Sequence, residues 1–142
     1  LAAQLGWVAE DAPTGRVGEQ ALGWLGRSTV PHGSAPALAQ HIEARLGRAA
    51  TCIDAPGRAP HRIAWCTGGA QSYFEAAIAA GADVFVTGEM SEPQAHYARE
   101  CGVAFIACGH HASERFGAPA VAAQVAQRLG LVHTFIDIPN PA

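Results

Sequence analysis

The stretch DVFVTGEMSEPQAHYARECGVAFIAC, residues 83–108, decides the fold because it predicts a strand, a helix and a second strand in direct succession. Residues 83–87 and 103–108 are nearly unbroken apolar runs, which are typical of strands covered on both faces of a sheet. Residues 91–101 have the pattern of a helix, and Gly102 is placed to end it. Strands that alternate with helices in this way indicate an α/β fold.

The same alternation extends along the rest of the chain. Further strands are predicted at residues 50–54, 62–66 and 132–138, with short strands around Trp24 and Leu25. Further helices are predicted at residues 34–46 and 70–80, and in a segment that ends at Leu129. The sequence therefore predicts a layered α/β sandwich with a largely parallel or mixed sheet.

Helix ends and helix faces are also readable from the pattern. Ser34 can cap the helix that follows it, and Ser91 with Gln94 forms a capping-box pattern. Apolar residues recur at helical spacing on one face of the first long helix and of the last one: Leu38, Ile42 and Leu46, then Val121, Val125 and Leu129.

Composition and charge restrict the class of protein. A chain of 142 residues that is 49% apolar can form one ordinary domain with a core. The net charge is −3 without a basic stripe, so a large nucleic-acid surface is not indicated. The apolar runs are too short to cross a membrane. Four cysteines without a C-x-x-C pair predict reduced thiols and a cytoplasmic location.

The start of the chain has the pattern of a helix end. Leu1 opens the sequence without a Met, and residues 1–6 resemble the last turns of a helix that Gly6 stops. We therefore expect this chain to be the C-terminal part of a longer protein.

Three turns that each follow a strand gather the conspicuous polar residues. These turns lie at residues 66–69, 87–91 and 108–111, and every one contains glycine. In sheets of this class, ligands bind outside the carboxyl ends of the strands. We therefore expect a functional site at the edge where these turns meet.

His110 and Glu114 are the strongest candidate metal ligands. At a spacing of four they share a helix face, where an imidazole and a carboxylate can hold Zn²⁺, Mn²⁺ or Fe²⁺. The alternative is an ordinary helix start with a favourable glutamate and solvated histidines. His111 is better suited to support a ligand than to be one.

The neighbouring turns supply further candidates. Glu89 and His96 could each act as a general base, a ligand or a partner that orients a ligand, or could simply be exposed. Residues Thr67, Gly68 and Gly69 could contact substrate or cradle an anion through backbone amides, although a two-glycine turn after a strand is common.

Two catalytic classes are not favoured by the pattern. Ser72 and Ser113 lack the G-x-S-x-G context of a serine hydrolase. Cys66 and Cys108 lie near the same edge, but neither has an obvious base beside it, so we interpret both as small buried residues.

Four segments together resemble a known family. They are WCTGGAQS (65–72), ADVFVTGEMSEPQAHYARECG (82–102), IACGHHASERFG (106–117) and FIDIPNPA (135–142). In this order and spacing they resemble the Nif-three-like family. Its members are also called GTP cyclohydrolase I type 2 homologues and dinuclear metal-centre hexameric proteins.

The resemblance implies an architecture. Members of this family fold as two similar, intertwined α/β halves with mixed sheets, and a two-metal site lies between the halves. They assemble as toroidal hexamers. Residues 62–142 would be the C-terminal α/β half that contributes to the metal site. Residues 1–61 would be the end of the preceding half together with a connecting region.

The resemblance also implies a function. His110 and Glu114 match two metal ligands of the family, and the remaining ligands, a His pair and an Asp, would lie upstream of Leu1. We expect two divalent ions (Zn, Fe or Mn) and a metal-dependent hydrolase that resembles GTP cyclohydrolase I type 2, with a small-molecule substrate such as a nucleotide. The alternative is a metal-binding scaffold or regulator that acts through contacts with protein or, less readily, DNA.

Pro119 limits how far the motif can be helical. If one helix began at His111, the ring of Pro119 would clash with the carbonyl of Arg115. We therefore expect the motif on a short turn, with a longer helix that starts near Ala118.

Overall fold

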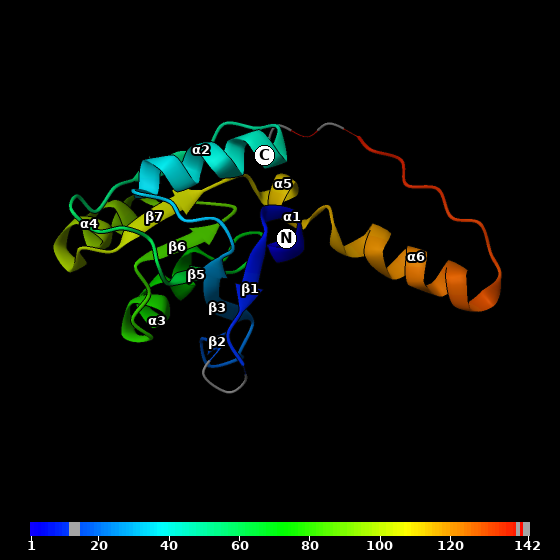
Figure 1. Cartoon of the computed structure of the whole chain (residues 1–142), viewed down its shortest axis with the longest axis horizontal. Helices are drawn as coiled ribbons and strands as arrows, with labels where there is room; N and C mark the ends of the chain where they lie inside the picture. The colour runs from blue at the N-terminus through cyan, green and yellow to red at the C-terminus, as the bar shows by residue number, and fades with distance from the viewer. Residues whose placement is uncertain (12–14, 139, 141–142) are drawn as a thin grey trace.

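The computed structural model describes residues 1–11, 15–138 and 140, and in this part of the chain seven strands form one mixed sheet (Figure 1). The strands are β1 (Trp7–Ala9), β2 (Arg16–Val17), β3 (Gly23–Ser28), β4 (Thr51–Ile53), β5 (Ile63–Trp65), β6 (Val84–Thr87) and β7 (Ala104–Ala107). The helices are α1 (Ala2–Leu5), α2 (Ala35–Leu46), the 3₁₀ turn η1 (Gln71–Tyr73), α3 (Phe74–Ala79), α4 (Glu92–Cys101), α5 (His110–Glu114) and α6 (Gly117–Leu129).

Parallel strands occupy the centre of the sheet. Its order is β1-β3-β5-β6-β7-β4, with β2 paired to β3. The neighbours β5, β6 and β7 are parallel, as the strand-helix-strand pattern predicts, while β1, β3 and β4 pair antiparallel with their neighbours. The predicted α/β class with a mixed sheet is confirmed. Residues 1–61 and 62–142 contribute strands to this same sheet, since β3 pairs with β5 and β4 with β7.

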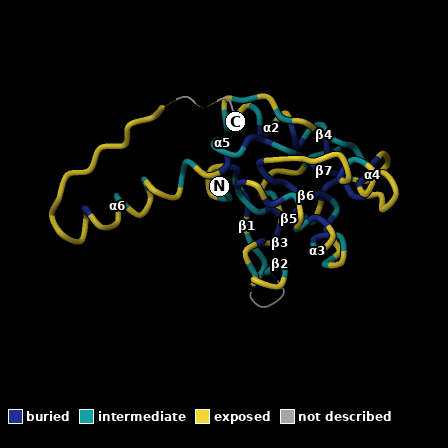
Figure 2. Tube along the Cα trace, turned by 180° about the vertical axis from the view of Figure 1, so that it is seen from behind, coloured by how far each residue is buried: buried dark blue, intermediate teal, exposed yellow. Residues whose placement is uncertain are grey.

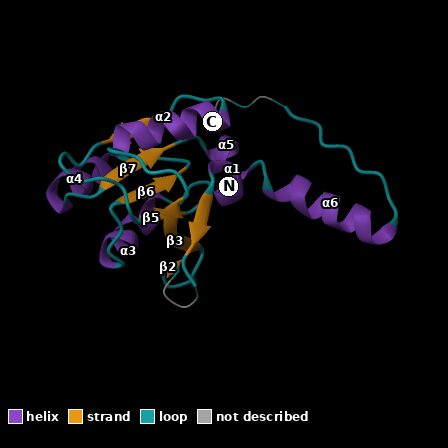
Figure 3. Ribbon diagram, viewed as in Figure 1, coloured by secondary structure: helices purple, strands orange, loops and turns teal. Residues whose placement is uncertain are grey.

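Helices cover both faces of the sheet (Figure 3). On one face, Leu38 and Ile42 of α2 are fully buried against β5, β6 and β7. On the other face, Phe74 of α3 packs against Phe85 and Phe105, with ring centroids 5.9 and 4.9 Å away. Because β6 and β7 are buried on both faces, their sequences are apolar without alternation.

The helix ends form as predicted. Ser34 Oγ accepts a hydrogen bond from Ala37 N, and Ser91 forms the full capping box with Gln94. Gly102 ends α4 with φ +61°, a left-handed conformation that glycine adopts without steric cost.

The break at Pro119 is confirmed. The motif at residues 110–114 forms the short helix α5, and the longer helix α6 begins at Gly117. Pro119 lies in the first turn of α6, where it does not interrupt an existing hydrogen bond.

The predicted strand at residues 132–138 is wrong. Residues 131–138 form no strand within the described chain; they are exposed and run back toward the body of the molecule after α6 (Figures 1 and 2). A strand needs a neighbour for its backbone groups, and no sheet edge of the described residues pairs with this segment. One side chain of the segment makes an ion pair with α5's C-cap residue: Asp137 Oδ2 lies 2.6 Å from an Nη atom of Arg115.

The aligned apolar face of α6 is also exposed. Val121, Val125 and Leu129 are all accessible, and Ala126 is its one buried residue within the described chain. No described helix is both long and apolar enough to span a membrane.

Candidate metal centre

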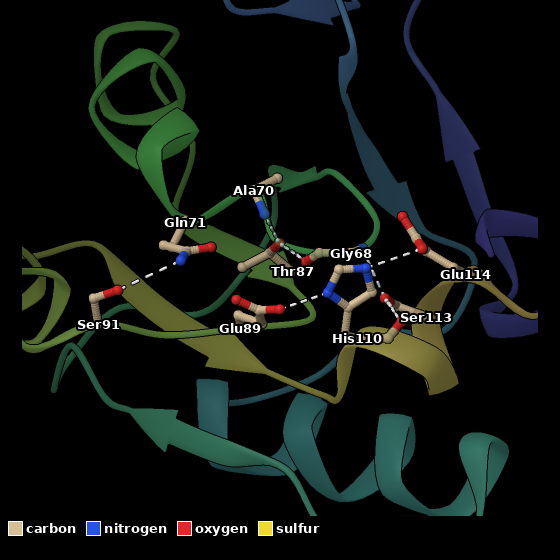
Figure 4. Close-up of polar contacts among 9 residues, drawn as sticks. All are labelled: Gly68, Ala70, Gln71, Thr87, Glu89, Ser91, His110, Ser113 and Glu114. Carbon is tan, nitrogen blue, oxygen red and sulfur yellow. Dashed lines mark hydrogen bonds and ion pairs between the residues drawn. The ribbon is translucent and has the colours of Figure 1, made fainter. Parts of the chain in front are cut away.

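The three glycine-containing turns meet at the carboxyl edge of β5, β6 and β7, and backbone hydrogen bonds join them in series. Gly88 N donates to Gly68 O at 2.9 Å, and Gly109 N donates to Gly88 O at 2.9 Å. The predicted common edge is therefore present, and Figure 4 shows the polar residues that converge on it.

The imidazole of His110 lies between two carboxylates. Its Nδ1 is 2.5 Å from Oε1 of Glu89, and its Nε2 is 3.1 Å from Oε2 of Glu114. Glu89 comes from the turn after β6, while His110 and Glu114 are one helical turn apart on α5 (Figure 4). These side chains are 41–50% exposed, so a small molecule or an ion can reach them.

The two carboxylates favour a charged imidazole. The hydrogen bond that His110 donates to Glu89 is the main cause that raises the pKa of His110, and the negative charges of Glu114 and Glu89 add to it. The same hydrogen bond with His110 lowers the pKa of Glu89. The hydrogen bond with Glu89 occupies Nδ1, so Nε2, which faces Glu114, is the nitrogen that would bind a metal after losing its proton.

The geometry at Nε2 fits one edge of a metal site. Two ligands about 2.0–2.2 Å from one ion lie about 2.8–3.6 Å apart at octahedral or tetrahedral angles. Nε2 of His110 and Oε2 of Glu114 are 3.1 Å apart. Within the described residues, however, no group of three or more His, Cys, Asp or Glu side chains is arranged to hold an ion. The residues fit part of a metal site and do not complete it.

Gly68 provides the space for the carboxylate of Glu114. A β-carbon at Gly68 would lie 2.2 Å from Oε1 of Glu114 and 3.1 Å from Nε2 of His110. Gly68 also has φ +69°, which a residue with a side chain adopts at a cost. At Gly69, a β-carbon would lie 3.3 Å from the carboxylate of Glu89. The two-glycine turn thus lies directly against both acidic residues.

Two buried hydroxyls hold the turns together, and the sequence pattern did not single them out as functional. Thr87 Oγ1 donates to Gly68 O at 3.0 Å and accepts from Ala70 N at 3.3 Å. Ser113 Oγ accepts from Gly68 N at 2.9 Å and donates to His110 O at 2.9 Å. For Thr87, the sequence offered one signal, a polar residue at the end of an otherwise apolar strand. Its role, however, depends on the contact with Gly68, which is 19 residues away in the sequence.

These bonds already engage two of the backbone amides at the two-glycine turn. The amide of Gly68 is occupied by Ser113, and that of Ala70 by Gly68 O and Thr87. Thr67 remains half-buried beside the site, and its hydroxyl has no hydrogen-bond partner among the described residues.

The two other predicted histidines lie apart from the carboxylates. The buried Nε2 atom of His111 has no hydrogen-bond partner in the described structure, and His111 lines a different cavity, with Arg48 and Arg115. His96 is exposed on α4 and forms no hydrogen bond or ion pair with the described residues. The structure thus brings Glu89, His110 and Glu114 together and does not bring His96 or His111 to them.

The two cysteines near this edge, Cys66 and Cys108, have the character of unreactive thiols. All four cysteines are free. Burial is the main cause that raises the pKa of Cys66, and Glu114 adds to it. Burial raises the pKa of Cys108 to about 11. Since the thiolate is the nucleophile, neither residue is activated.

Comparison with known proteins assigns the chain to a family. The model of the Duf34/NIF3 family (NGG1p interacting factor 3) matches residues 1–141. The chain belongs to the Duf34/NIF3 family. A GTP cyclohydrolase 1 type 2 homolog from Pseudomonas aeruginosa is 46% identical over 142 residues, which are 100% of this chain and 55% of that protein. The homolog of the same name from Escherichia coli K12 is 51% identical over 106 residues, 74% of this chain and 43% of that protein.

A solved structure supports the same assignment. The chain resembles protein ybgI, described as of unknown function, with a TM-score of 0.90, 44% identity and coverage of 99% of this chain and 55% of that one. This Duf34/NIF3 chain therefore spans about half the length of the relatives it matches.

Proposed function

We propose that this Duf34/NIF3 chain carries part of the two-metal centre of a hydrolase that resembles GTP cyclohydrolase I type 2. The main supporting observation is the imidazole of His110, which is fixed at Nδ1 by Glu89 and opposed at Nε2 by Glu114 at 3.1 Å. A carboxylate that orients a ligating histidine is a common feature of protein metal sites. The names of the relatives supply the reaction class.

Each residue then has a defined task. Nε2 of His110 and the carboxylate of Glu114 would hold metal, and Glu89 would keep the Nδ1 proton in place and orient the ring. Two divalent ions, Zn, Fe or Mn, would supply Lewis acidity toward the substrate and a water activated for attack. Glu89 faces the open edge and could also take up or return a proton there. His96, exposed on the neighbouring helix, is the second proposed acid–base group.

The site needs further donors. The described residues bring together too few for an ion, and the relatives are nearly twice as long as this chain. We propose that the full-length protein supplies the remaining ligands and assembles with copies of itself, as a hexamer. Its substrate would be a small molecule such as a nucleotide, and its reduced thiols are in keeping with the cytoplasm.

Metal content and turnover of the full-length protein test this proposal. We expect Glu114→Ala to lose bound metal and GTP hydrolysis together, and Glu89→Gln to weaken metal binding about 10- to 100-fold. His96→Ala should keep its metal and lose turnover. Glu100→Ala, a change of an exposed glutamate on α4, is the matched control and should resemble wild type.

Equal metal content in wild type and Glu114→Ala would overturn the ligand assignment. A metal-loaded wild type without GTP turnover would overturn the cyclohydrolase assignment alone.

A second candidate is a metal-binding scaffold that acts through protein contacts. The family description refers to an interaction with another protein, NGG1p. In the described chain, α6 and residues 131–138 also expose many large apolar side chains: Val121, Val125, Leu129, Leu131, Val132, Phe135, Ile136 and Ile138. A pull-down with the full-length protein tests this function, and metal-dependent turnover without any retained partner would count against it.

A further inference from the structure

A cavity of about 320 Å³, which we call the tryptophan pocket, adjoins the candidate metal centre. The pocket is lined by the first residues of the chain and by residues of three strands and the turns beside them: Leu1, Ala2, Ala9, Leu22, Trp24, Trp65, Cys66 and Thr67. The volume is at the lower end of the range for small-molecule sites, which suits one ring system rather than a whole large ligand. The side chains that line this pocket carry no formal charge.

Trp24 is held in a fixed orientation. The guanidinium of Arg16 stacks on its ring, with Cζ 3.8 Å from the ring centroid. Arg16 is itself anchored, because its Nε donates to the carbonyl of Ala21 at 2.7 Å and an Nη atom donates to the same oxygen. Trp24 is nevertheless 38% exposed, and it lines the pocket. An aromatic surface that is fixed in advance binds a planar partner with little loss of side-chain entropy.

The part of the lining that comes from the neighbouring strand is rigid as well. Trp65 is the register partner of Trp24 on the neighbouring strand β5, so both side chains project from the same face of the sheet. Trp65 is buried and packs against Trp7, with ring centroids 5.3 Å apart. The two tryptophans therefore frame the pocket from adjacent strands.

The pocket leads to the carboxylate of Glu114. Cys66 and Thr67 line the pocket, and the next residue, Gly68, is the one whose β-carbon would collide with Glu114. Cys66 lies close enough to Glu114 for that negative charge to contribute to its raised pKa. The hydroxyl of Thr67, without a hydrogen-bond partner in the described chain, is available at this boundary.

We propose that the tryptophan pocket binds the planar aromatic ring of the substrate, stacked on Trp24, while the rest of the substrate extends toward Glu114 and His110. The proposal rests on the hydrolase function above and adds the substrate class: a neutral heterocyclic ring joined to a part that reaches the metal centre. Thr67 would contact the edge of the ring. Aromatic side chains can stack on a ring, whereas an uncharged lining has no cationic group to pair with a phosphate.

Binding to metal-loaded full-length protein, measured by calorimetry, tests the pocket. GTP is the probe with a ring, and inorganic tripolyphosphate is the matched probe without one. We expect Trp24→Leu to weaken GTP binding about tenfold or more, in the range that base stacking supplies, and to leave tripolyphosphate binding unchanged. Trp24→Phe, which keeps an aromatic ring, should retain most of the affinity for GTP. Tyr97→Leu, a change of another exposed aromatic residue on α4, should affect neither probe.

Three results would overturn the proposal. They are an unchanged GTP affinity in Trp24→Leu, an equal loss for GTP and tripolyphosphate, and no GTP binding to the wild-type protein. The first of these is also expected if another part of the full-length protein fills the pocket. Trp24-dependent binding of GTP without turnover would support the pocket and contradict the hydrolase proposal, so the two can fail separately.

Discussion

Gly68 shows at the scale of one residue how closely the backbone is fitted to the acidic side chains. It combines a left-handed φ of +69° with a carboxylate in the place of its missing β-carbon. Many turn glycines share the left-handed backbone conformation, but the close contact with the carboxylate of Glu114 occurs at Gly68.

We predict that Gly68→Ala weakens metal binding by the full-length protein. Gly130→Ala is the matched control, because Gly130 has φ +66° and nothing within 4 Å of a β-carbon. Both changes should cost about 1–2 kcal/mol of stability in urea titrations from the backbone alone. Only Gly68→Ala should also lower bound zinc, since the new methyl group displaces Glu114. Equal zinc affinity in the two variants would show that Glu114 is not a ligand or tolerates the shift.

Ala21 carries backbone strain of its own. It is a non-glycine residue with φ +51° in the turn before β3, and its carbonyl anchors Arg16. We predict that Ala21→Gly stabilises the protein by up to about 1 kcal/mol, because glycine adopts this conformation without a steric cost. Ala123→Gly, in the exposed interior of α6, should instead destabilise it by about 1 kcal/mol. Thermal unfolding measures both, and a destabilised Ala21→Gly variant would contradict the strain argument.

At the scale of the elements, Thr87 joins the end of β6 to the turn after β5. Its buried hydroxyl bonds to Gly68 O and Ala70 N, and so fixes the turn that borders the site.

We predict that Thr87→Val destabilises the protein by about 1–2 kcal/mol in urea unfolding, since buried backbone groups lose a partner. Thr87→Ser keeps the hydroxyl and should cost less. The reverse order of these two variants would show that the methyl group matters more than the hydrogen bonds.

Elements with strong local signals were predictable from sequence. The capping box at Ser91, the strands at residues 83–87 and 103–108, and the break at Pro119 depend on neighbours within a few residues. Residues 132–138 have the composition of a strand, yet strand formation depends on a partner that the local sequence does not specify. The prediction failed for that reason.

At the scale of the whole molecule, Glu10 and Arg62 tie the first strands to the second half of the chain. Two hydrogen bonds of 2.7 and 2.6 Å join them across 52 residues of sequence, and Arg62 also donates to the carbonyl of Ala80. The hydrogen bonds from Arg62 are the main cause that lowers the pKa of Glu10 below its ordinary value of 4.5.

A carboxyl group with a lowered pKa stabilises the fold above its ordinary pKa, and this stabilisation is lost as the pH falls through the lowered value. We therefore predict that Glu10→Gln costs up to about 1 kcal/mol at pH 7, because solvent screens this partly exposed pair, and that the difference from wild type shrinks below pH 4.5. Urea unfolding between pH 3 and 7 measures it, with Glu100→Gln as the control. A difference that grows toward acid would contradict the sign of this effect.

The sequence by itself determined the helices and strands of the central βαβ units, the edge where the turns meet, and the pair His110 and Glu114. These features depend on periodicity, capping and a spacing of four residues, which are all local properties. Only the tertiary structure decided that Glu89 binds Nδ1 of His110, that Gly68 makes room for Glu114, and that Trp24 lies beside Trp65 on the neighbouring strand. Each of these contacts joins residues from different turns or strands, and their meeting depends on sheet order and register, which no local pattern encodes.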